Sequence, residues 1–288
     1  MTKSSINTVV IHKGYQPYLK YNLQITSKNN NVILIGDSSV EFLKNISDKI
    51  QFINIDTLNK DSKINFYKEK FINYSTNSFD FEWFCFERVF LLEQLLIEMN
   101  LEKVFHIDSD NVLLTNVNNL VFTSDNAYII PRYQSSFGMA GSIHAGLIDT
   151  RFCKEFSQLY EDIYVNNSKF NLIEKKIDYH KLNNLKGGIC DMTLYYLLFN
   201  NILTTTQNLL QPIKNIHNEE FIFINNFNLP EGYYGKDNFE MKKKKIKIYK
   251  GNLINDIINN HKVRIANIHF QGSAKKFLNK SLKYKLKY

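Results

Sequence analysis

The stretch from Lys103 to Leu114, KVFHIDSDNVLL, decides the fold prediction. Its short, mainly apolar run from Val104 to Ile107, bounded by polar residues, predicts an interior strand of a parallel sheet. Asp108 and Asp110 follow that strand directly. Because open α/β sheets bind ligands beyond the carboxyl ends of their strands, we expect both carboxylates to lie in a ligand-binding crevice.

A divalent cation would explain two acidic side chains so close together. Neighbouring carboxylates raise each other's pKa unless a counter-charge stabilises both anions. Carboxylate oxygens suit Mg²⁺ or Mn²⁺, so Asp108 and Asp110 are predicted to hold a metal that in turn holds a phosphorylated ligand. The alternative is a turn without a ligand, because Asp, Ser and Asn are common turn residues, and this stretch alone leaves both open.

The order of the first elements predicts the fold class. Strands are expected at Asn7–His12, Asn31–Asp37 and Ile50–Ile55, with helices at Tyr15–Ser27 and Val40–Ile46 between them. This β-α-β-α-β order predicts an α/β fold with a Rossmann-like, mostly parallel sheet and right-handed crossovers. The glycine fingerprint of dinucleotide-binding proteins does not follow the first strand.

An apolar helix from Asp80 to Asn100 leads into the strand before Asp108. It carries Arg88 near its centre, and a buried arginine needs a partner. That partner is either Glu87 or Glu82 in a structural ion pair, or a ligand in the crevice.

The remaining elements complete the α/β pattern. Gly146 interrupts a predicted strand, which indicates close approach of a ligand or another backbone. Asp191 opens a helix and is, from its position alone, best explained as a helix cap. The predicted segments are strands Ala127–Pro131, Ser142–Thr150 and Val263–Phe270, and helices Arg151–Asn166 and Asp191–Asn200.

Composition favours a single globular protein in a reducing compartment. The 288 residues include no apolar segment long enough to span a membrane and no apolar signal-peptide region near the start. Cys85, Cys153 and Cys190 are widely spaced, so we expect reduced thiols and a cytoplasmic location.

The net charge of +8 favours anionic partners such as phosphorylated ligands, nucleic acid or an anionic membrane. The run Lys242–Lys245 is best explained as a solvated surface. The tail 273–288 interleaves lysines with Phe, Leu and Tyr, which suits either peripheral contact with an anionic membrane or a packed terminal helix.

Together these residues resemble a known family. The chain is similar to GT-A fold nucleotide-sugar glycosyltransferases, most of all to glycosyltransferase family 8, which includes bacterial lipooligosaccharide galactosyltransferases and glycogenin. The resemblance covers about residues 7 to 280. Matching positions are the Asp-x-Asp of Asp108 and Asp110, the upstream Arg88, the segment Ala145-Gly146-Leu147-Ile148-Asp149, the helix-opening Asp191, and His269, Gly272 and Lys275 of a His-x-x-Gly-x-x-Lys motif. The chain departs from the family at Met192, where Gln is usual, and at Lys276-Phe277, where Pro-Trp is usual.

The resemblance implies a role for each matched residue. Asp108, Asp110 and His269 would ligate Mn²⁺ or Mg²⁺, while Lys275 and the backbone of Gly272 would hold the diphosphate. Arg88 would contact the donor, and Asp191 would orient the donor sugar or the acceptor hydroxyl. The implied donor site also includes His12, Asp37 and Ser109.

The implied protein is a metal-dependent hexosyltransferase that retains anomeric configuration. It would move a hexose from a nucleotide sugar, a UDP-hexose by this resemblance, to a hydroxyl of a surface or capsular glycan or a glycolipid. We expect one GT-A domain, with a nucleotide-binding half at about 1–125, an acceptor half at about 126–272 and the basic-aromatic tail 273–288. The tail would suit a lipid-linked acceptor at the cytoplasmic face of a membrane.

Three other classes compete with this interpretation. In a phosphatase of the haloacid dehalogenase type, Asp108 would be the nucleophile and Asp110 the acid/base. A protein of the same fold could bind a nucleotide sugar without turnover. The lysine runs also permit nucleic-acid binding, but no nucleic-acid-binding motif is recognised, and we expect none.

Overall fold

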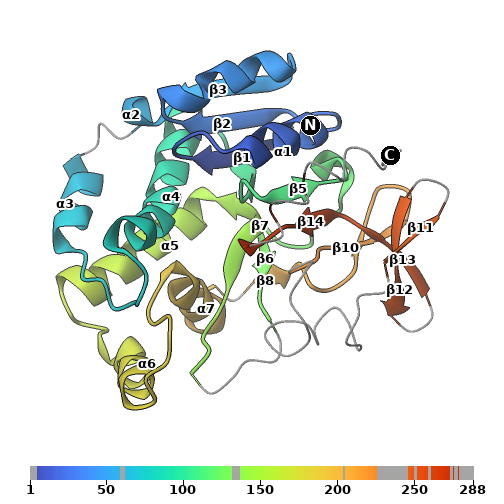
Figure 1. The fold of residues 1–288 in the computed structure, drawn as a ribbon. Helices are drawn as coiled ribbons and strands as arrows, with labels where there is room; N and C mark the ends of the chain where they lie inside the picture. The colour runs from blue at the N-terminus through green and yellow to red at the C-terminus, as the bar shows by residue number, and fades with distance from the viewer. Residues whose placement is uncertain are drawn as a thin grey trace.

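A central seven-stranded sheet organises the computed structural model, which describes residues 5–58, 62–131, 137–203, 205–225, 246–249, 252–258, 261–272, 275 and 278 (Figure 1). The strand order is β3-β2-β1-β4-β7-β6-β8. The strands are β1 (Asn7–His12), β2 (Val32–Gly36), β3 (Ile50–Asn54), β4 (Lys103–Ile107), β6 (Asn126–Ile129), β7 (Ser142–Asp149) and β8 (Thr206–Asn208).

Most of this sheet is parallel, as the sequence predicts. Strand β1 pairs in parallel with both β2 and β4, β2 pairs in parallel with β3, and β6 pairs in parallel with β8. Only β7 runs against its neighbours β4 and β6. The predicted α/β fold, with a Rossmann-like, mostly parallel central sheet flanked by helices, is confirmed.

Helices cover both faces of the sheet. Helix α1 (Pro17–Thr26) and the 3-10 segment η1 (Ser38–Ile46) pack on one face, and α4 (Phe79–Glu98), α5 (Thr150–Tyr160) and α7 (Asp191–Asn201) pack on the other. The remaining helical segments are α2 (Ile55–Leu58), α3 (Ser62–Lys70), η2 (Val117–Asn119), the π-helical η3 (Glu161–Val165) and α6 (Asn171–Leu182).

Alternation along the strands explains this layering. Val9 packs into the cluster that contains α4 and α5, whereas Val10 packs into the cluster that contains α1. Successive strand residues point to opposite faces, so a strand that is apolar throughout requires cover on both sides. The two clusters bury the sheet completely around β1 and β4.

A short antiparallel pair extends from the carboxyl end of β4. Strand β5 (Asn111–Leu113) pairs with β14 (Asn267–His269), and His269 lies opposite Asn111. A residue near the end of the described chain is thereby placed beside the Asp108–Asp110 segment. This pairing joins the late part of the chain to the central sheet.

A second sheet lies beside the first, drawn in orange and red in Figure 1. Its order is β11-β12-β13-β10-β9, with β9 (Ile213–Lys214), β10 (Glu220–Ile222), β11 (Ile246–Tyr249), β12 (Asn252–Ile258) and β13 (His261–Ile265). The predicted single strand Val263–Phe270 is wrong, because it is divided between β13 and β14. At the division, the amide of Ala266 donates to Ile222 and its carbonyl accepts from Leu114, so the chain passes from one sheet to another.

Two predicted helices differ from the structure in type. The segment predicted at Val40–Ile46 belongs to the 3-10 segment η1, whose first residues are capped by Asp37. The helix predicted at Arg151–Asn166 is α-helical only to Tyr160 and continues as η3, where the amide of Asn166 donates to the carbonyl of Glu161. Periodicity alone does not distinguish these helix types.

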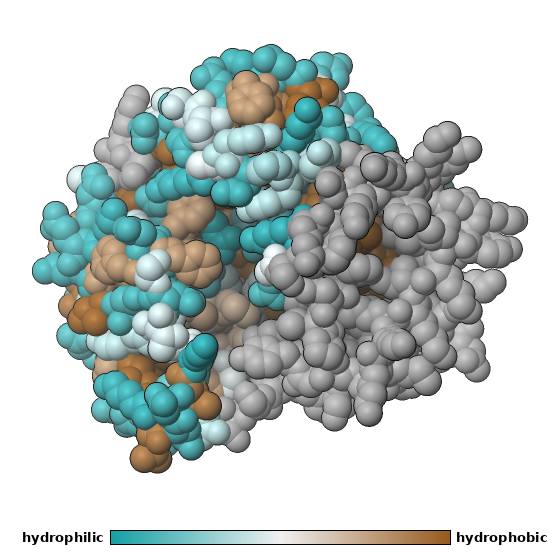
Figure 2. All heavy atoms as spheres, in the orientation of Figure 1, coloured by the Kyte–Doolittle hydropathy of each residue, from teal (hydrophilic) through white to brown (hydrophobic). Residues whose placement is uncertain are grey.

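In the part of the chain that the structure describes, no helix combines the length and apolar character needed to cross a bilayer. Figure 2 shows hydrophilic residues over most of the described surface on this face, with apolar residues in small groups. The run Lys242–Lys245 and all of the tail 273–288 except Lys275 and Leu278 lie outside the described residues.

Gly36 provides a test of the packing at the carboxyl end of β2. A Cβ atom there would lie 2.4 Å from Val40 Cγ2 and 2.7 Å from the carbonyl oxygen of His12. We expect Gly36→Ala to lower the free energy of unfolding by about 1–3 kcal/mol, because the strands must shift to admit a methyl group. Chemical denaturation followed by circular dichroism measures this change.

Gly146→Ala is the matched control in β7. A Cβ atom at Gly146 would lie no closer than 3.4 Å to its neighbours, which is an ordinary contact. Its effect should stay within about 1 kcal/mol and can be stabilising, since alanine restricts the unfolded chain. Equal losses in the two variants would contradict this account of the packing.

Candidate functional site

The site begins where β4 ends. Asp108, Ser109 and Asp110 form a turn between β4 and β5, closed by the Asn111 amide donating to the carbonyl of Asp108 at 2.9 Å. The Asp108 amide donates to the carbonyl of His144 on β7 at 3.0 Å. The two predicted carboxylates therefore lie at the carboxyl end of an interior strand, as the sequence indicates.

The amide of Asn22 on α1 supports the other side of this turn. Its Nδ2 lies 2.8 Å from the carbonyl oxygen of Ser109, 3.0 Å from that of Asn111 and 3.3 Å from that of Asp108. Asn22 is fully buried. The turn is thus held by a helix on one face of the sheet and by β7 on the other side.

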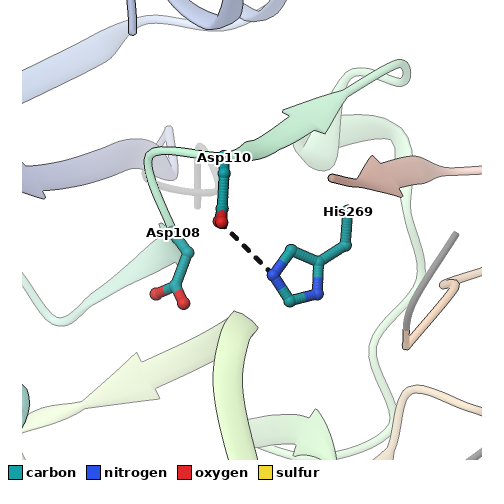
Figure 3. A group of neighbouring side chains, drawn as sticks. All are labelled: Asp108, Asp110 and His269. Atoms are coloured by element: carbon teal, nitrogen blue, oxygen red, sulfur yellow. Dashed lines mark ion pairs between the residues drawn. The ribbon is translucent and has the colours of Figure 1, made fainter. Parts of the chain in front are cut away.

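His269 reaches the turn through β14. The Phe270 amide donates to the carbonyl of Asp110 at 2.9 Å, which fixes the two backbones to each other. The His269 Nε2 atom lies 3.3 Å from Asp110 Oδ1 (Figure 3). Figure 3 shows the imidazole and the two carboxylates directed into one space between β4 and β14.

The three side chains fit a divalent cation. Asp108, Asp110 and His269 each offer one ligand atom, and these atoms lie within 4.8 Å of one another. The His269 Nδ1 atom lies 2.7 Å from the carbonyl oxygen of Asn225, which can only accept, so Nδ1 carries the proton. In the neutral ring the lone pair of Nε2 faces the carboxylates, which is the orientation that metal-ligating histidines adopt, whereas the protonated ring donates from Nε2 to Asp110.

Without a cation, the charges around Asp110 are balanced by protein cations. Burial alone would lower the pKa of His269, but the hydrogen bond to Asp110, the negative charges of Asp110 and Asp108 and the contact with Asn225 together raise it. Lys275 Nζ lies 3.1 Å from the second Asp110 oxygen. Burial would raise the pKa of Asp110, and the contact with His269 lowers it instead. The Asp110 carboxylate is therefore stabilised as an anion.

Arg88 joins two carboxylates across the site. Its guanidinium donates to Asp108 Oδ1 at 2.6 Å and to Asp191 Oδ2 at 3.0 Å. The expected pairing of Arg88 with Glu87 or Glu82 is therefore not the arrangement found. Glu87 pairs with Lys13 at 2.6 Å, and Glu82 accepts a hydrogen bond from Asn77 at 2.6 Å.

The two carboxylates beside Arg88 differ in their electrostatics. Burial would raise the pKa of Asp108, but the charge of Arg88 holds it well below its usual range. For Asp191, burial outweighs the attraction of Arg88 and raises the pKa. Asp191 is the first residue of α7, and its Oδ1 accepts from the Met192 amide. The N-cap is Cys190, so the explanation of Asp191 as a helix cap is wrong.

Two further histidines surround the turn. The ring of His144 stacks on His269 with centroids 4.2 Å apart and an angle of 17° between the planes. His106 on β4 donates from Nδ1 to the carbonyl oxygen of Ile143, 2.7 Å away, because a carbonyl oxygen can only accept. Burial lowers the pKa of His106 to about 4 and that of His144 to about 3. Both rings are therefore neutral at physiological pH.

Lys275 and Gly272 follow His269 in the chain, and Lys275 reaches back to Asp110. The Lys275 ammonium group lies 5.1 Å from the centre of the Tyr18 ring as well as beside Asp110. Gly272 adopts a φ of 60°, and a Cβ built there would meet nothing within 4 Å. The backbone at Gly272 is exposed and borders open space.

His12 and Asp37 stand at the carboxyl ends of β1 and β2. Burial lowers the pKa of His12, whose ring contacts that of Tyr18 with centroids 5.9 Å apart. Asp37 Oδ2 accepts from the Gly14 amide at 2.6 Å, and Oδ1 accepts from the Ser39 amide at 2.9 Å. The predicted donor contact through Asp37 must therefore share oxygens that already hold two loops.

Sequence reasoning missed Asn22, Asn111, Asn267 and His144. The Asn267 amide donates to Asn111 Oδ1 at 2.8 Å, and the Asn111 amide reaches the carbonyl of His144. A signal existed at Asn22, because asparagine is a poor helix former on an otherwise apolar helix face. The other three lie in strands, where a polar residue in an apolar run was the only sign.

Comparison with solved structures finds similarity at low sequence identity. No model of a known protein family matches the sequence, and no curated protein matches it. A solved structure described as "PaToxG Glycosyltransferase" aligns at 12% identity over 67% of this chain and 69% of that chain, with a TM-score of 0.38. A glycosyltransferase involved in glycosylation of the major capsid of PBCV-1 aligns at 8% identity over 55% of this chain and 74% of that chain, with a TM-score of 0.30. Similarity of this degree does not extend to activity, so the chemistry must come from the side chains.

Arg88→Met tests whether the site depends on this guanidinium as a counter-charge. Removing it leaves Asp108 and Asp191 buried without their partner, and we expect a loss of about 3–5 kcal/mol in the free energy of unfolding without metal. Added Mn²⁺ should raise the melting temperature more in the variant than in the unmodified protein, because the cation replaces part of the lost charge. Thermal denaturation with and without Mn²⁺ measures both effects.

Arg264→Met is the control for Arg88→Met. Arg264 forms a comparable double contact with Glu219, at 2.8 and 3.0 Å, but both side chains are 39% exposed. Its removal should cost about 1 kcal/mol or less. A loss at Arg88 no greater than at Arg264 would contradict the role assigned to the buried guanidinium.

Proposed function

We propose that this protein is a metal-dependent glycosyltransferase that moves a hexose from a nucleotide sugar, preferentially UDP-linked, to a hydroxyl group of a glycan or glycolipid. The observation that carries the proposal is the convergence of Asp108, Asp110 and His269, whose ligand atoms lie within 4.8 Å of one another at the carboxyl end of β4. That position in an α/β sheet is where such folds bind ligands. It is also the arrangement that the resemblance to GT-A glycosyltransferases implies.

The metal would be Mn²⁺ or Mg²⁺, held by the two carboxylates and by His269 Nε2. Two hard oxygen donors and one imidazole suit these ions better than they suit softer metals. When bound, the cation would neutralise the negative charge that develops on the diphosphate leaving group. Asn225 contributes by fixing the imidazole, through the 2.7 Å contact between its carbonyl oxygen and Nδ1.

Protein cations would complete the diphosphate site. Lys275 Nζ lies beside Asp110, so it is near the proposed cation position and adds a second positive charge for phosphate oxygens. Gly272 leaves open space for a phosphate to approach the backbone. Ser109 lies between the two carboxylates, and His12 and Asp37 lie at the ends of the neighbouring strands, where the nucleoside would be held.

Arg88 and Asp191 would act on the sugar. Arg88 would donate to the donor sugar or its phosphate, since its guanidinium bridges the metal-side carboxylate and Asp191. Asp191 would orient the donor sugar or the acceptor hydroxyl. An oxocarbenium-like transition state would be stabilised by a carboxylate near the anomeric carbon, and we propose retention of configuration.

The parts of the chain would divide these tasks. Residues to about 125 would bind the nucleotide, about 126–272 would form the acceptor side, and the tail 273–288 would contact an anionic membrane surface. A lipid-linked acceptor for a surface or capsular glycan, reached at the cytoplasmic face of a membrane, fits this division.

A donor screen tests the proposal. Purified protein is titrated with UDP, GDP, CMP and dTDP sugars in Mn²⁺ and then in EDTA, with calorimetry for binding and nucleotide release for turnover. We expect one nucleotide class to bind only with metal. Asp110→Asn and His269→Gln should each abolish this binding, because each removes a metal ligand.

Asp162→Asn is the matched control for Asp110→Asn. Asp162 also has a cationic partner, Lys169 at 2.8 Å, but it lies in η3, outside the cation centre. The control should bind the donor like the unmodified protein. Binding without turnover in any acceptor mixture would indicate a nucleotide-sugar-binding protein, and phosphatase activity without nucleotide-sugar binding would refute the proposal.

A further inference from the structure

The buried side chain of Asn22 on α1 donates hydrogen bonds to the turn after β4 and not to its own helix. Its single amide nitrogen faces the carbonyl oxygens of Asp108, Ser109 and Asn111 at 3.3, 2.8 and 3.0 Å. An amide nitrogen carries only two hydrogens, so three carbonyls share two donors. One nitrogen atom therefore contacts three backbone carbonyls of the turn that carries both acidic side chains.

The oxygen of the same amide is also engaged. Asn22 Oδ1 accepts from the hydroxyl of Thr26 at 2.8 Å, and that hydroxyl oxygen accepts from the Leu113 amide at 3.2 Å. Asn22 with Thr26 thereby contacts backbone groups from residue 108 to residue 113. This segment contains the whole turn and all of β5, the strand that pairs with β14 and His269.

The contacts from the other side leave the turn few alternative conformations. The carbonyl of His144 accepts from the Asp108 amide, and it also accepts from the Asn111 side chain. Carbonyl oxygens in a buried turn cost free energy unless donors reach them. Without Asn22, the carbonyls of Ser109 and Asn111 would have to turn toward other donors, and the carboxylates on the same residues would move with them.

Asn30, a second buried asparagine, makes similar hydrogen bonds but does not contact the turn, so it serves as the comparison for Asn22. Asn30 follows α1, is 2% exposed, donates to the carbonyls of Thr26 and Thr115 at 3.2 and 2.9 Å, and accepts from the Val117 amide at 3.0 Å. Its bonds equal those of Asn22 in kind. They hold the chain after β5, however, and not the turn with the acidic residues.

We propose that Asn22 is a positioning residue of the cation centre, which fixes the 108–111 turn so that Asp108 and Asp110 face His269 and thereby sets the affinity for the divalent cation. The cation part rests on the proposed function. Asn22 does not contact the cation position through any ligand atom named above; it acts through the backbone carbonyls of the turn. Outer partners of this kind commonly change metal affinity by about 10–100-fold when removed.

Mn²⁺ alone is the probe, and Asn22→Ala and Asn30→Ala are the matched pair. Calorimetric titration gives the dissociation constant of Mn²⁺, and electron paramagnetic resonance measures the concentration of free Mn²⁺ independently. Neither measurement needs an activity assay. The melting temperature of both variants should fall, since each substitution leaves buried backbone groups without their hydrogen-bond partners. Only Asn22→Ala should weaken Mn²⁺ binding by about tenfold or more, with Asn30→Ala within about twofold of the unmodified protein.

Hydrogen exchange in the absence of metal gives a second readout. We expect faster exchange of the Asn111 and Leu113 amides in Asn22→Ala and unchanged exchange there in Asn30→Ala. Asn22→Ser, which keeps one donor and leaves a smaller cavity, replaces Asn22→Ala if the latter does not fold, and should give an intermediate affinity.

Equal weakening of Mn²⁺ binding by both variants would overturn the inference, because Asn22 would then act only through stability. Unchanged binding and unchanged exchange in Asn22→Ala would also overturn it. If the unmodified protein binds no Mn²⁺, the metal-dependent function and the cation part of this inference both fail. In that case the exchange data alone decide whether Asn22 positions the turn.

Discussion

The compensation of buried negative charge is the constraint on which this structure depends. Asp108, Asp110 and Asp191 gather at one end of the central sheet with side chains only 25%, 10% and 6% exposed. Carboxylates so far from water require partners or they take up protons. Arg88 supplies one partner from the middle of α4, and His269 and Lys275 supply others from the late part of the chain. The apolar layers around the sheet serve to hold these groups in register.

The sheet topology brings these partners together from distant parts of the chain. Strand β4 lies at the centre of the sheet, so the turn after it opens between α1, β7 and the helix bearing Arg88. The β5–β14 ladder then adds the imidazole beside the turn. Arg88 and His269 lie on the regular elements α4 and β14, and sites on such elements keep their geometry more closely.

The sequence was sufficient for the general architecture and for the centre of the site. Strong periodicity identified β1, β2, β3, β4 and α4, and the acidic pair after β4 indicated where a ligand would bind. The partner of Arg88 could not be predicted, because Glu82 and Glu87 are near in sequence whereas Asp108 and Asp191 become near only through the fold. The division of Val263–Phe270 between two sheets was equally hidden, since both halves are apolar and extended.

The buried asparagines could not be placed for a related reason. An amide such as Asn22 or Asn267 is informative only when its acceptors are known, and those acceptors are backbone carbonyls from other elements. Composition and spacing contain no record of such contacts. The gap between prediction and structure is therefore concentrated at polar residues inside apolar segments.

The pairing of β5 with β14 also has a consequence during protein synthesis. The acidic turn is translated long before His269, and β5 has no β14 to pair with until residue 269 has left the ribosome. An incomplete chain consequently carries carboxylates that lack the imidazole and the ammonium group of Lys275. Long-range pairings form late because closing a long loop costs entropy before any contact rewards it. The grouping of Asp108, Asp110 and His269 is thus delayed until residue 269 has been synthesised, so that products ending before it lack this group.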